Sequence, residues 1–249
     1  MKVAVVTPTI GSDYLEKCVK SIQNQTYENL THYIFIDGLE HDKKVQDIIK
    51  NYDVSQVLLE ENVGKGWYGH RVYAACSYLV NADVICYLDE DNWFEPNHVE
   101  TLVQKIKAGA DWAYSLRKIV DKDGEFVCED NCESLGKWPI YFNKEEFHID
   151  TSSFMVKRDV ANKIGPAWYG QWGADRKFFS ALKTYFPNFA CSKEYSLCYR
   201  LDGNENSVTA EFFETGNAEN AKQYPNGFPW KEKFKQEYLV GPGITIVGN

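Results

Sequence analysis

Hydrophobic and polar residues follow a repeating order over roughly the first 108 residues of the chain. Short apolar runs, rich in β-branched residues, predict strands at 3–6, 33–36, 57–59 and 84–88. Apolar residues spaced three and four positions apart predict helices near 15–22, 45–49, 72–79 and 99–106. Four cycles of strand and helix are typical of an α/β fold with a parallel, doubly wound sheet.

The second half of the chain is less regular. Strands are predicted at 112–120 and 125–128 around a polar Asp-Lys-Asp-Gly turn, and again at 151–156 and 195–199. Beyond residue 203 the sequence becomes polar and then aromatic. We therefore expect one α/β domain over residues 1–205 and a helical, aromatic C-terminal extension over residues 206–249.

Polar side chains follow three of the predicted strands. Thr7 and Thr9 come after the first strand, Asp37 after the second, and the triplet Asp89-Glu90-Asp91 after the fourth. In an open α/β sheet the ligand lies beyond the carboxyl ends of the strands. These side chains are therefore predicted to face one crevice.

The acidic triplet suggests a metal site. Mg²⁺ and Mn²⁺ prefer carboxylate oxygens and usually share their coordination between one or two carboxylates and a substrate phosphate. Two aspartates separated by one residue at a strand end can reach the same ion. The alternative is an exposed turn with a helix-capping carboxylate, which such residues also favour.

Four ordered segments together resemble the family-2 glycosyltransferases of GT-A fold. They are Val-Val-Thr-Pro-Thr (5–9), Phe-Ile-Asp-Gly (35–38), Glu-Asn-Val-Gly-Lys-Gly (61–66) and Tyr-Leu-Asp-Glu-Asp (87–91). The resemblance covers about residues 1–205 and implies a mixed, mainly parallel sheet flanked by helices. It also implies transfer of a sugar, with inversion, from a nucleotide-sugar to an acceptor hydroxyl. A retaining reaction on the same fold is the mechanistic alternative.

In the resembled family these segments bind the donor. The resemblance implies that Thr7, Pro8 and Thr9 line the base pocket and that Asp37 hydrogen-bonds the base or ribose. UDP is the expected nucleotide by family frequency. Lys65 and Arg71 follow the third strand and are candidates for contacting the phosphates, although solvated surface charges are the alternative.

The resemblance also assigns metal- and donor-binding roles to the acidic triplet. Asp91 is expected to be the main ligand of Mn²⁺ or Mg²⁺, with Asp89 near the ribose and the metal, and Glu90 beside them on the donor side. The metal would bridge the diphosphate and neutralise charge on the leaving group. A histidine often completes this site in the family, but here Asp202 stands near that place, so Asp202, water or no third ligand are all open.

The expected catalytic base is Asp175, at the start of a predicted helix in the segment 172–179. The family often has a glutamate just before this aspartate, and here that position is Ala174. An ordinary acidic residue favoured by the helix dipole is the alternative. Glu145, Glu146 and Asp150 are weaker candidates for the base.

The resemblance places Ser152 on the strand that borders donor sugar and acceptor. Trp168 and Trp172 lie in a glycine-containing segment and form either an aromatic wall for a sugar ring or a packed loop. The sequence leaves a glycan, a lipid-linked or a protein acceptor open. His70 and His148 are interpreted as surface or packing residues.

Composition and charge limit the kinds of binding partner and the cellular compartment that we expect. The net charge is −9 with no basic stripe, which argues against nucleic acid. The apolar run at the N-terminus is too short for a signal peptide or an integral membrane segment. The 7 cysteines show no repeated metal-binding spacing, so a reducing compartment and a soluble, cytoplasmic protein are expected.

Two other function classes remain as alternatives. A sugar nucleotidyltransferase would carry a Gly-rich, Arg- or Lys-bearing loop after the first strand, whereas residues 7–12 contain no basic residue. A non-catalytic nucleotide- or glycan-binding module would keep Asp37 and the aromatic surface without turnover.

Overall fold

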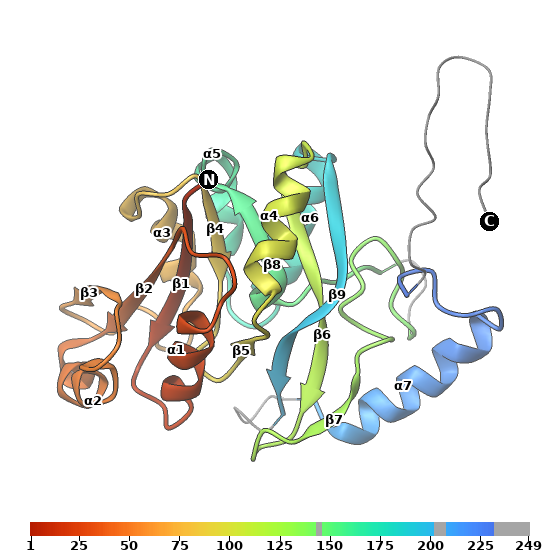
Figure 1. Ribbon diagram of the computed structural model, residues 1–249, viewed down its shortest axis with the longest axis horizontal. Coiled ribbons are helices and arrows are strands. Elements are labelled where there is room, and N and C mark those ends of the chain that lie inside the picture. Colours follow the sequence, from red (N-terminus) through yellow and green to blue (C-terminus); the bar gives the residue numbers. More distant parts are fainter. Residues whose placement is uncertain (143–145, 202–207, 232–249) are drawn as a thin grey trace.

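A mixed β-sheet forms the centre of the molecule (Figure 1). The structure is a computed structural model that describes residues 1–142, 146–201 and 208–231. Within these residues the strands are β1 (Val3–Thr9), β2 (Leu30–Asp37), β3 (Ser55–Leu59), β4 (Val84–Tyr87), β5 (Trp93–Phe94), β6 (Trp112–Val120), β7 (Phe126–Glu129), β8 (Phe154–Lys157) and β9 (Phe189–Arg200). Their order across the sheet is β3-β2-β1-β4-β8-β6-β9-β5, and β7 pairs with β6.

The N-terminal half of the sheet is parallel, as predicted. Strand β1 lies between β2 and β4, so that Val3 pairs with Leu30 on one side and Val84 on the other. Strand β8 then runs antiparallel between β4 and β6, whereas β9 runs parallel to β6. The expected mixed α/β fold class is therefore confirmed.

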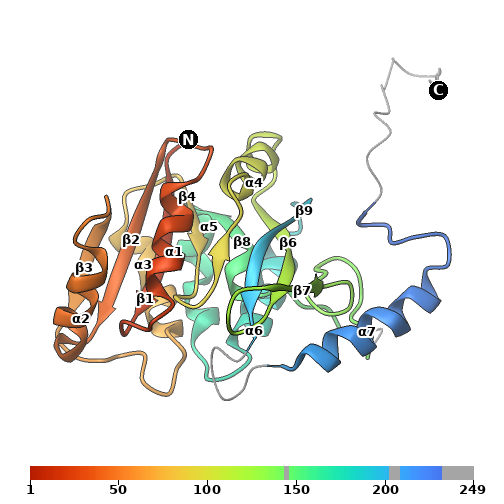
Figure 2. The same ribbon diagram turned by 60° about the horizontal axis from the view of Figure 1, so that its bottom comes forward.

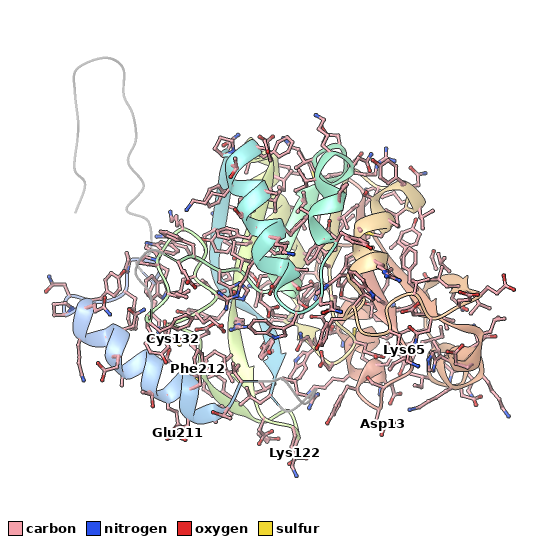
Figure 3. The ribbon with its side chains drawn as sticks, turned by 180° about the vertical axis from the view of Figure 1, so that it is seen from behind. Asp13, Lys65, Lys122, Cys132, Glu211 and Phe212 are labelled. Carbon is pink, nitrogen blue, oxygen red and sulfur yellow. The ribbon has the colours of Figure 1, made fainter. Side chains whose placement is uncertain are left out.

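Helices cover both faces of this sheet. One face carries α1 (Leu15–Gln23), α2 (Leu39–Ile49) and α4 (His98–Lys107), and the other carries α3 (His70–Leu79), α5 (Arg158–Ile164) and α6 (Ala174–Tyr185) (Figures 1 and 3). In β1, Val3 and Val5 pack toward α1 and α4, while Ala4 and Val6 pack toward α3. Because both faces are buried, the strands read as continuous apolar runs.

Two strands begin at other residues than the hydrophobic pattern predicts. The strand expected from residue 151 begins only at Phe154, because Asp150 caps a short 3₁₀ turn, η1 (Thr151–Ser153), by accepting a hydrogen bond from the Ser152 amide at 2.9 Å. Strand β9 begins at Phe189 rather than at 195. Lys193 has a positive φ of 64° and the ladder with β6 changes register there, so the alternation is interrupted.

Helix α7 (Ala210–Gln223) lies beside β7 and projects from that end of the sheet (Figure 2). The side chains of Asn217 and Asn220 bond the backbone near residues 129–131, including a 2.6 Å bond from Asn220 Nδ2 to the Asn131 carbonyl. Gly216 allows close approach, since a Cβ there would lie 2.7 Å from Cys132 Sγ. The predicted domain boundary near residue 205 falls outside the described residues.

We expect Asn220→Ala to lower the free energy of unfolding by about 1–3 kcal/mol, because the buried carbonyl of Asn131 loses its donor. Urea unfolding measures the change. The neighbouring substitution Glu219→Ala, at an exposed site of the same helix, is the control and should change stability by no more than about 0.5 kcal/mol. Equal effects of the two substitutions would contradict a stabilising role for the hydrogen bond from Asn220 to the Asn131 carbonyl.

Candidate active site

A cleft of about 760 Å³ opens at the carboxyl ends of β1, β2 and β4. Of the residues expected to bind the donor, the metal or the acceptor proton, those that line the cleft are Pro8, Thr9, Asp37, Lys65, Asp89, Glu90, Asp91 and Asp175. Figure 3 shows Lys65 on the chain beyond the end of β3. Residues far apart in the sequence are thus brought to one site, as the rule for parallel sheets predicts.

Asp37 holds the loop that follows β3. Its Oδ1 and Oδ2 accept hydrogen bonds from the backbone N–H groups of Val63 and Gly64, each at 2.8 Å. Gly64 is required for this approach, because a Cβ there would lie 2.3 Å from Asp37 Oδ2. Burial raises the pKa of Asp37, while the two backbone bonds oppose the shift. The carboxylate therefore shapes one wall of the cleft.

Arg71 supports the same loop. Its Nη1 donates to the Val63 carbonyl at 3.3 Å, and its guanidinium lies 4.1 Å from the centre of the Trp67 ring. The residues that line the cleft include Lys65 and not Arg71. Of the two predicted phosphate contacts, the geometry therefore favours Lys65.

Glu90 points at the loop between β1 and α1. The Thr9 hydroxyl donates to its Oε2 at 2.5 Å, and the Ser12 backbone N–H donates to the same oxygen at 2.9 Å. Gly11 N–H in turn donates to Thr9 Oγ1. The middle carboxylate of the triplet thus fixes the opposite wall of the cleft.

Asp89 lies at the floor of the cleft. Tyr73 donates its hydroxyl proton to Asp89 Oδ1 at 2.7 Å, and Ser152 Oγ donates to Oδ2 at 3.2 Å. Burial raises the pKa values of both Asp89 and Asp91, and the neighbouring carboxylates Asp89 and Glu90 add to the shift at Asp91. The sequence pattern does not single out Tyr73, because the spacing of this segment predicts only an amphipathic helix.

A buried arginine lies behind this floor. Arg117 on β6 pairs with Asp130 at 2.8 Å, with Asp150 at 2.9 Å and with Glu133. Asp150 also lines the cleft, and burial raises its pKa to about 7 although Arg117 opposes the shift. Asp150 therefore connects the charge cluster to the cleft through η1 and Ser152.

Asp175 lies in the first turn of α6, with its side chain facing the cleft. Its Oδ1 accepts from the Arg176 N–H at 2.8 Å, and its Oδ2 is 3.6 Å from Nε2 of His148. His148 is buried, and burial lowers its pKa, so the ring is neutral near pH 7. The sequence predicts a surface or packing role for this histidine, and the structure places it in the interior beside Asp175.

Other predicted residues lie away from the open cleft. Thr7 is fully buried, with its hydroxyl 2.9 Å from His32 Nε2. Trp168 stacks on Phe178 in the core, and Trp172 is 68% exposed. Ser152 is buried under Asp89. Glu145 and Asp202 lie outside the described residues.

The donor set suits a hard divalent cation that shares its coordination with a phosphate. Asp89 and Asp91 both line the cleft, and their raised pKa values indicate a site short of positive charge. Among the described residues no group of three or more His, Cys, Asp or Glu side chains is arranged to hold a metal. The candidate ligands are thus two carboxylates, with the remaining coordination left to substrate and water.

A mainly parallel β-sheet with helices on both faces and a carboxylate-lined cleft at its strand ends is the architecture of the GT-A fold. The same fold is seen in residues 1–349 of S. aureus TarS in complex with UDP-GlcNAc, with a TM-score of 0.62 and 12% identity over 84% of this chain and 62% of that chain. The family model for glycosyl transferase family 2 matches residues 4–165, more than half of the chain. The chain therefore belongs to glycosyl transferase family 2.

Two curated relatives are similar over part of their length. The GalNAc(5)-diNAcBac-PP-undecaprenol beta-1,3-glucosyltransferase of Campylobacter jejuni is 27% identical over 55% of this chain and 44% of its own. The glucosyl-dolichyl phosphate glucuronosyltransferase of Haloferax volcanii is 35% identical over 45% of this chain and 36% of its own. The chain thus spans less than half of either relative. In the part of the chain that the structure describes, no helix is long and apolar enough to cross a membrane.

We expect the free energy of unfolding to rise as the pH falls from 8 to about 6.5. Over this interval Asp91 and Asp150, whose folded-state pKa values are raised to about 7, take up protons, whereas unfolded aspartates, with pKa near 3.9, do not. The slope is at most about 1.4 kcal/mol per pH unit and group. Below about 6.5 the rise flattens, because His32, His98 and His148, with pKa values lowered by burial, take up protons on unfolding.

Urea unfolding in EDTA, from pH 8 to pH 5.5, measures this trend without competition from divalent cations. Asp91→Asn should give a shallower rise, since one of the titrating carboxyls is removed. Asp47→Asn removes an exposed carboxylate on α2 and should keep the wild-type slope. A stability that is constant between pH 8 and 6.5 would contradict the raised pKa values.

Proposed function

We propose that the protein transfers a sugar from a nucleoside diphosphate donor, a UDP-sugar in the first instance, to an acceptor hydroxyl with inversion. One observation carries the proposal. A single cleft is lined both by Asp89 and Asp91, which suit a metal-bound diphosphate, and by Asp175, which suits a general base. Membership of glycosyl transferase family 2 supports the same reaction class.

The donor occupies the part of the cleft between the two anchored loops. Pro8 and Thr9 line it on the β1 side, and the loop held by Asp37 lines it on the β3 side. Lys65 on this loop brings positive charge toward the diphosphate. With both oxygens of Asp37 bonded to backbone N–H groups, the residue acts mainly by shaping the pocket, and a direct bond to base or ribose uses its remaining lone pairs.

Mn²⁺ or Mg²⁺, when bound, supplies positive charge that stabilises the departing diphosphate. Asp91 and Asp89 would hold it. Tyr73 and Ser152 fix the Asp89 carboxylate by donating to its two oxygens. Asp89 and Asp91 are both partly buried and both line the cleft, so each carboxylate is accessible to an ion there. The cation also offsets the repulsion among the cleft carboxylates, which otherwise favours their protonated forms.

Asp175 accepts the proton of the incoming hydroxyl. As the acceptor oxygen forms its bond to the anomeric carbon, the bond from that carbon to the diphosphate breaks, and the electron pair leaves with the diphosphate. The N–H of Arg176 holds one carboxylate oxygen, and the neutral ring of His148 lies behind the other. Both contacts limit the rotation of the carboxylate.

The structural neighbour and the relatives support the choice of substrates. TarS was crystallised with UDP-GlcNAc, and the C. jejuni and H. volcanii relatives carry names of enzymes that act on lipid-linked sugars. A nucleotidyltransferase is disfavoured by Glu90. This carboxylate anchors the loop after β1, where such an enzyme would need positive charge to hold a triphosphate.

We expect one nucleoside diphosphate, UDP first, to raise the melting temperature in Mn²⁺ or Mg²⁺ and to have no effect in EDTA. A ligand that binds only the folded state stabilises it by mass action, about 2.7 kcal/mol at a hundredfold excess over Kd. A panel of UDP, GDP, dTDP and CDP by thermal unfolding measures the shift. Asp91→Asn should abolish it, and Asp47→Asn should keep it. Equal shifts in EDTA and in metal would refute the cation's role.

We expect Asp175→Asn to lower sugar transfer by roughly 10²–10⁴-fold while leaving the UDP-dependent shift in melting temperature unchanged, because only the base is removed. Release of UDP from the donor sugar in the presence of acceptor measures turnover. Glu146→Gln, at the weaker candidate for the base, should retain transfer. Near-normal turnover in Asp175→Asn would assign the proton to another group.

A further inference from the structure

Two hollows lie along the outer side of α6, the helix whose first turn carries Asp175 of the catalytic cleft. Figure 3 looks onto this face, where α6 and α5 lie side by side, opposite the face of α1 and α4. Asp175 lines the cleft, and the next residue, Arg176, lines the first hollow. Ala181 and Tyr185 line both hollows, so the two are contiguous.

The first hollow is basic. Its volume is about 480 Å³, and its lining residues are Arg176, Lys177, Ser180, Ala181, Thr184 and Tyr185. The Arg176 guanidinium forms ion pairs with Glu133 at 3.5 Å and with Glu146 at 3.6 Å. Lys177 is exposed and has no carboxylate within ion-pair distance in the described part of the chain. Two adjacent cations beside the active site stand out in a chain of net charge −9.

The second hollow is mainly apolar. It lies between the α5–η2 segment and the end of α6, with η2 spanning Gly165–Trp168, and has a volume of about 540 Å³. Its lining residues are Lys163, Ile164, Pro166, Ala167, Ala181, Tyr185 and Phe186. Lys163 is the one charged member of that lining, and its Nζ lies 5.7 Å from the centre of the Phe186 ring. The side chain of Tyr185 is 71% exposed, so apolar surface here faces water.

We propose that this groove along α6 binds a lipid-linked acceptor, with its phosphate at Arg176 and Lys177 and its hydrocarbon chain in the apolar hollow. The proposal rests on the proposed function, because it places the acceptor's sugar at Asp175. Along α6, the catalytic cleft, the basic hollow and the apolar hollow then match the sugar, the phosphate and the hydrocarbon chain of such a molecule. From Asp175 to Tyr185 the helix rises about 15 Å, which gives the chain an extended path.

The chemistry of the linings favours this occupant over a plain oligosaccharide. A sugar chain needs hydroxyl partners along its length, and the second hollow offers Ile164, Pro166, Ala167 and Phe186 instead. A hydrocarbon chain removes this surface from water without leaving a polar group unpaired. The positive charge next to Asp175 complements a phosphate and repels a cationic ligand.

Geranylgeranyl phosphate is a probe that carries both features. Equilibrium dialysis below its critical micelle concentration measures binding to the full chain, without nucleotide or turnover. Geranylgeraniol lacks the phosphate and tests whether the phosphate contributes to binding. Inorganic phosphate lacks the hydrocarbon chain and tests whether that chain contributes. Ala181→Glu adds a carboxylate where the two hollows meet, and Lys177→Gln removes a cation. Gln104→Glu, at an exposed site on α4 across the sheet, is the control for added charge.

We expect the probe to bind wild type and Gln104→Glu equally, and to bind Ala181→Glu and Lys177→Gln about tenfold or more weakly. Binding that is absent, or unchanged in Ala181→Glu, would overturn the proposal. Equal affinity for geranylgeraniol, or for lipid vesicles without the probe, would also overturn it, since either shows a general apolar surface. Because no nucleotide is present, a failure here is separate from a failure of the UDP panel.

Discussion

The buried ion cluster around Arg117 is the constraint on which the site depends. A guanidinium that is only 2% exposed is stable only when its charge is matched, and here three carboxylates from two segments, Asp130 and Glu133 from one and Asp150 from the other, converge on it. Asp130 in turn accepts from the backbone N–H groups of residues 132–134, and Asp150 caps η1. One side chain therefore fixes two irregular segments that would otherwise have no reason to adopt a single conformation.

The same cluster connects the C-terminal helix to the cleft. Asn131, next to Asp130, accepts from the Trp230 indole and donates its backbone N–H to Asn217 of α7. On the other side, the segment from Asp150 to Ser152 reaches the carboxylate of Asp89. Hydrogen bonds, ion pairs and the peptide link between Asp130 and Asn131 thus connect α7 to the floor of the active site, so α7 and the cleft share one polar framework.

Negative charge is concentrated in the cleft at a cost in stability that function explains. Asp89, Asp91 and Asp150 all line one hollow, and burial raises the pKa value of each. A cluster of carboxylates without a matching cation is unfavourable for the folded protein alone. It becomes favourable once a divalent cation and a diphosphate occupy the cleft, which is the arrangement that the proposed reaction uses.

The sequence by itself determined the strand and helix order, the parallel half of the sheet and the carboxylates at its edge. Each of these follows from local periodicity and from the rule that strand ends meet. Only the tertiary structure decided the partners of individual side chains. Thr7 and Thr9 are two residues apart and share one face of β1. Thr7 nevertheless contacts Cys18 and His32 in the core, whereas Thr9 donates to Glu90 at the cleft, because Thr9 is the last residue of the strand. Likewise, the roles of Tyr73 and His148 depend on partners that are 16 and 27 residues away in sequence (89 − 73 and 175 − 148). No pattern along the chain encodes those contacts, since they arise from packing between separate elements.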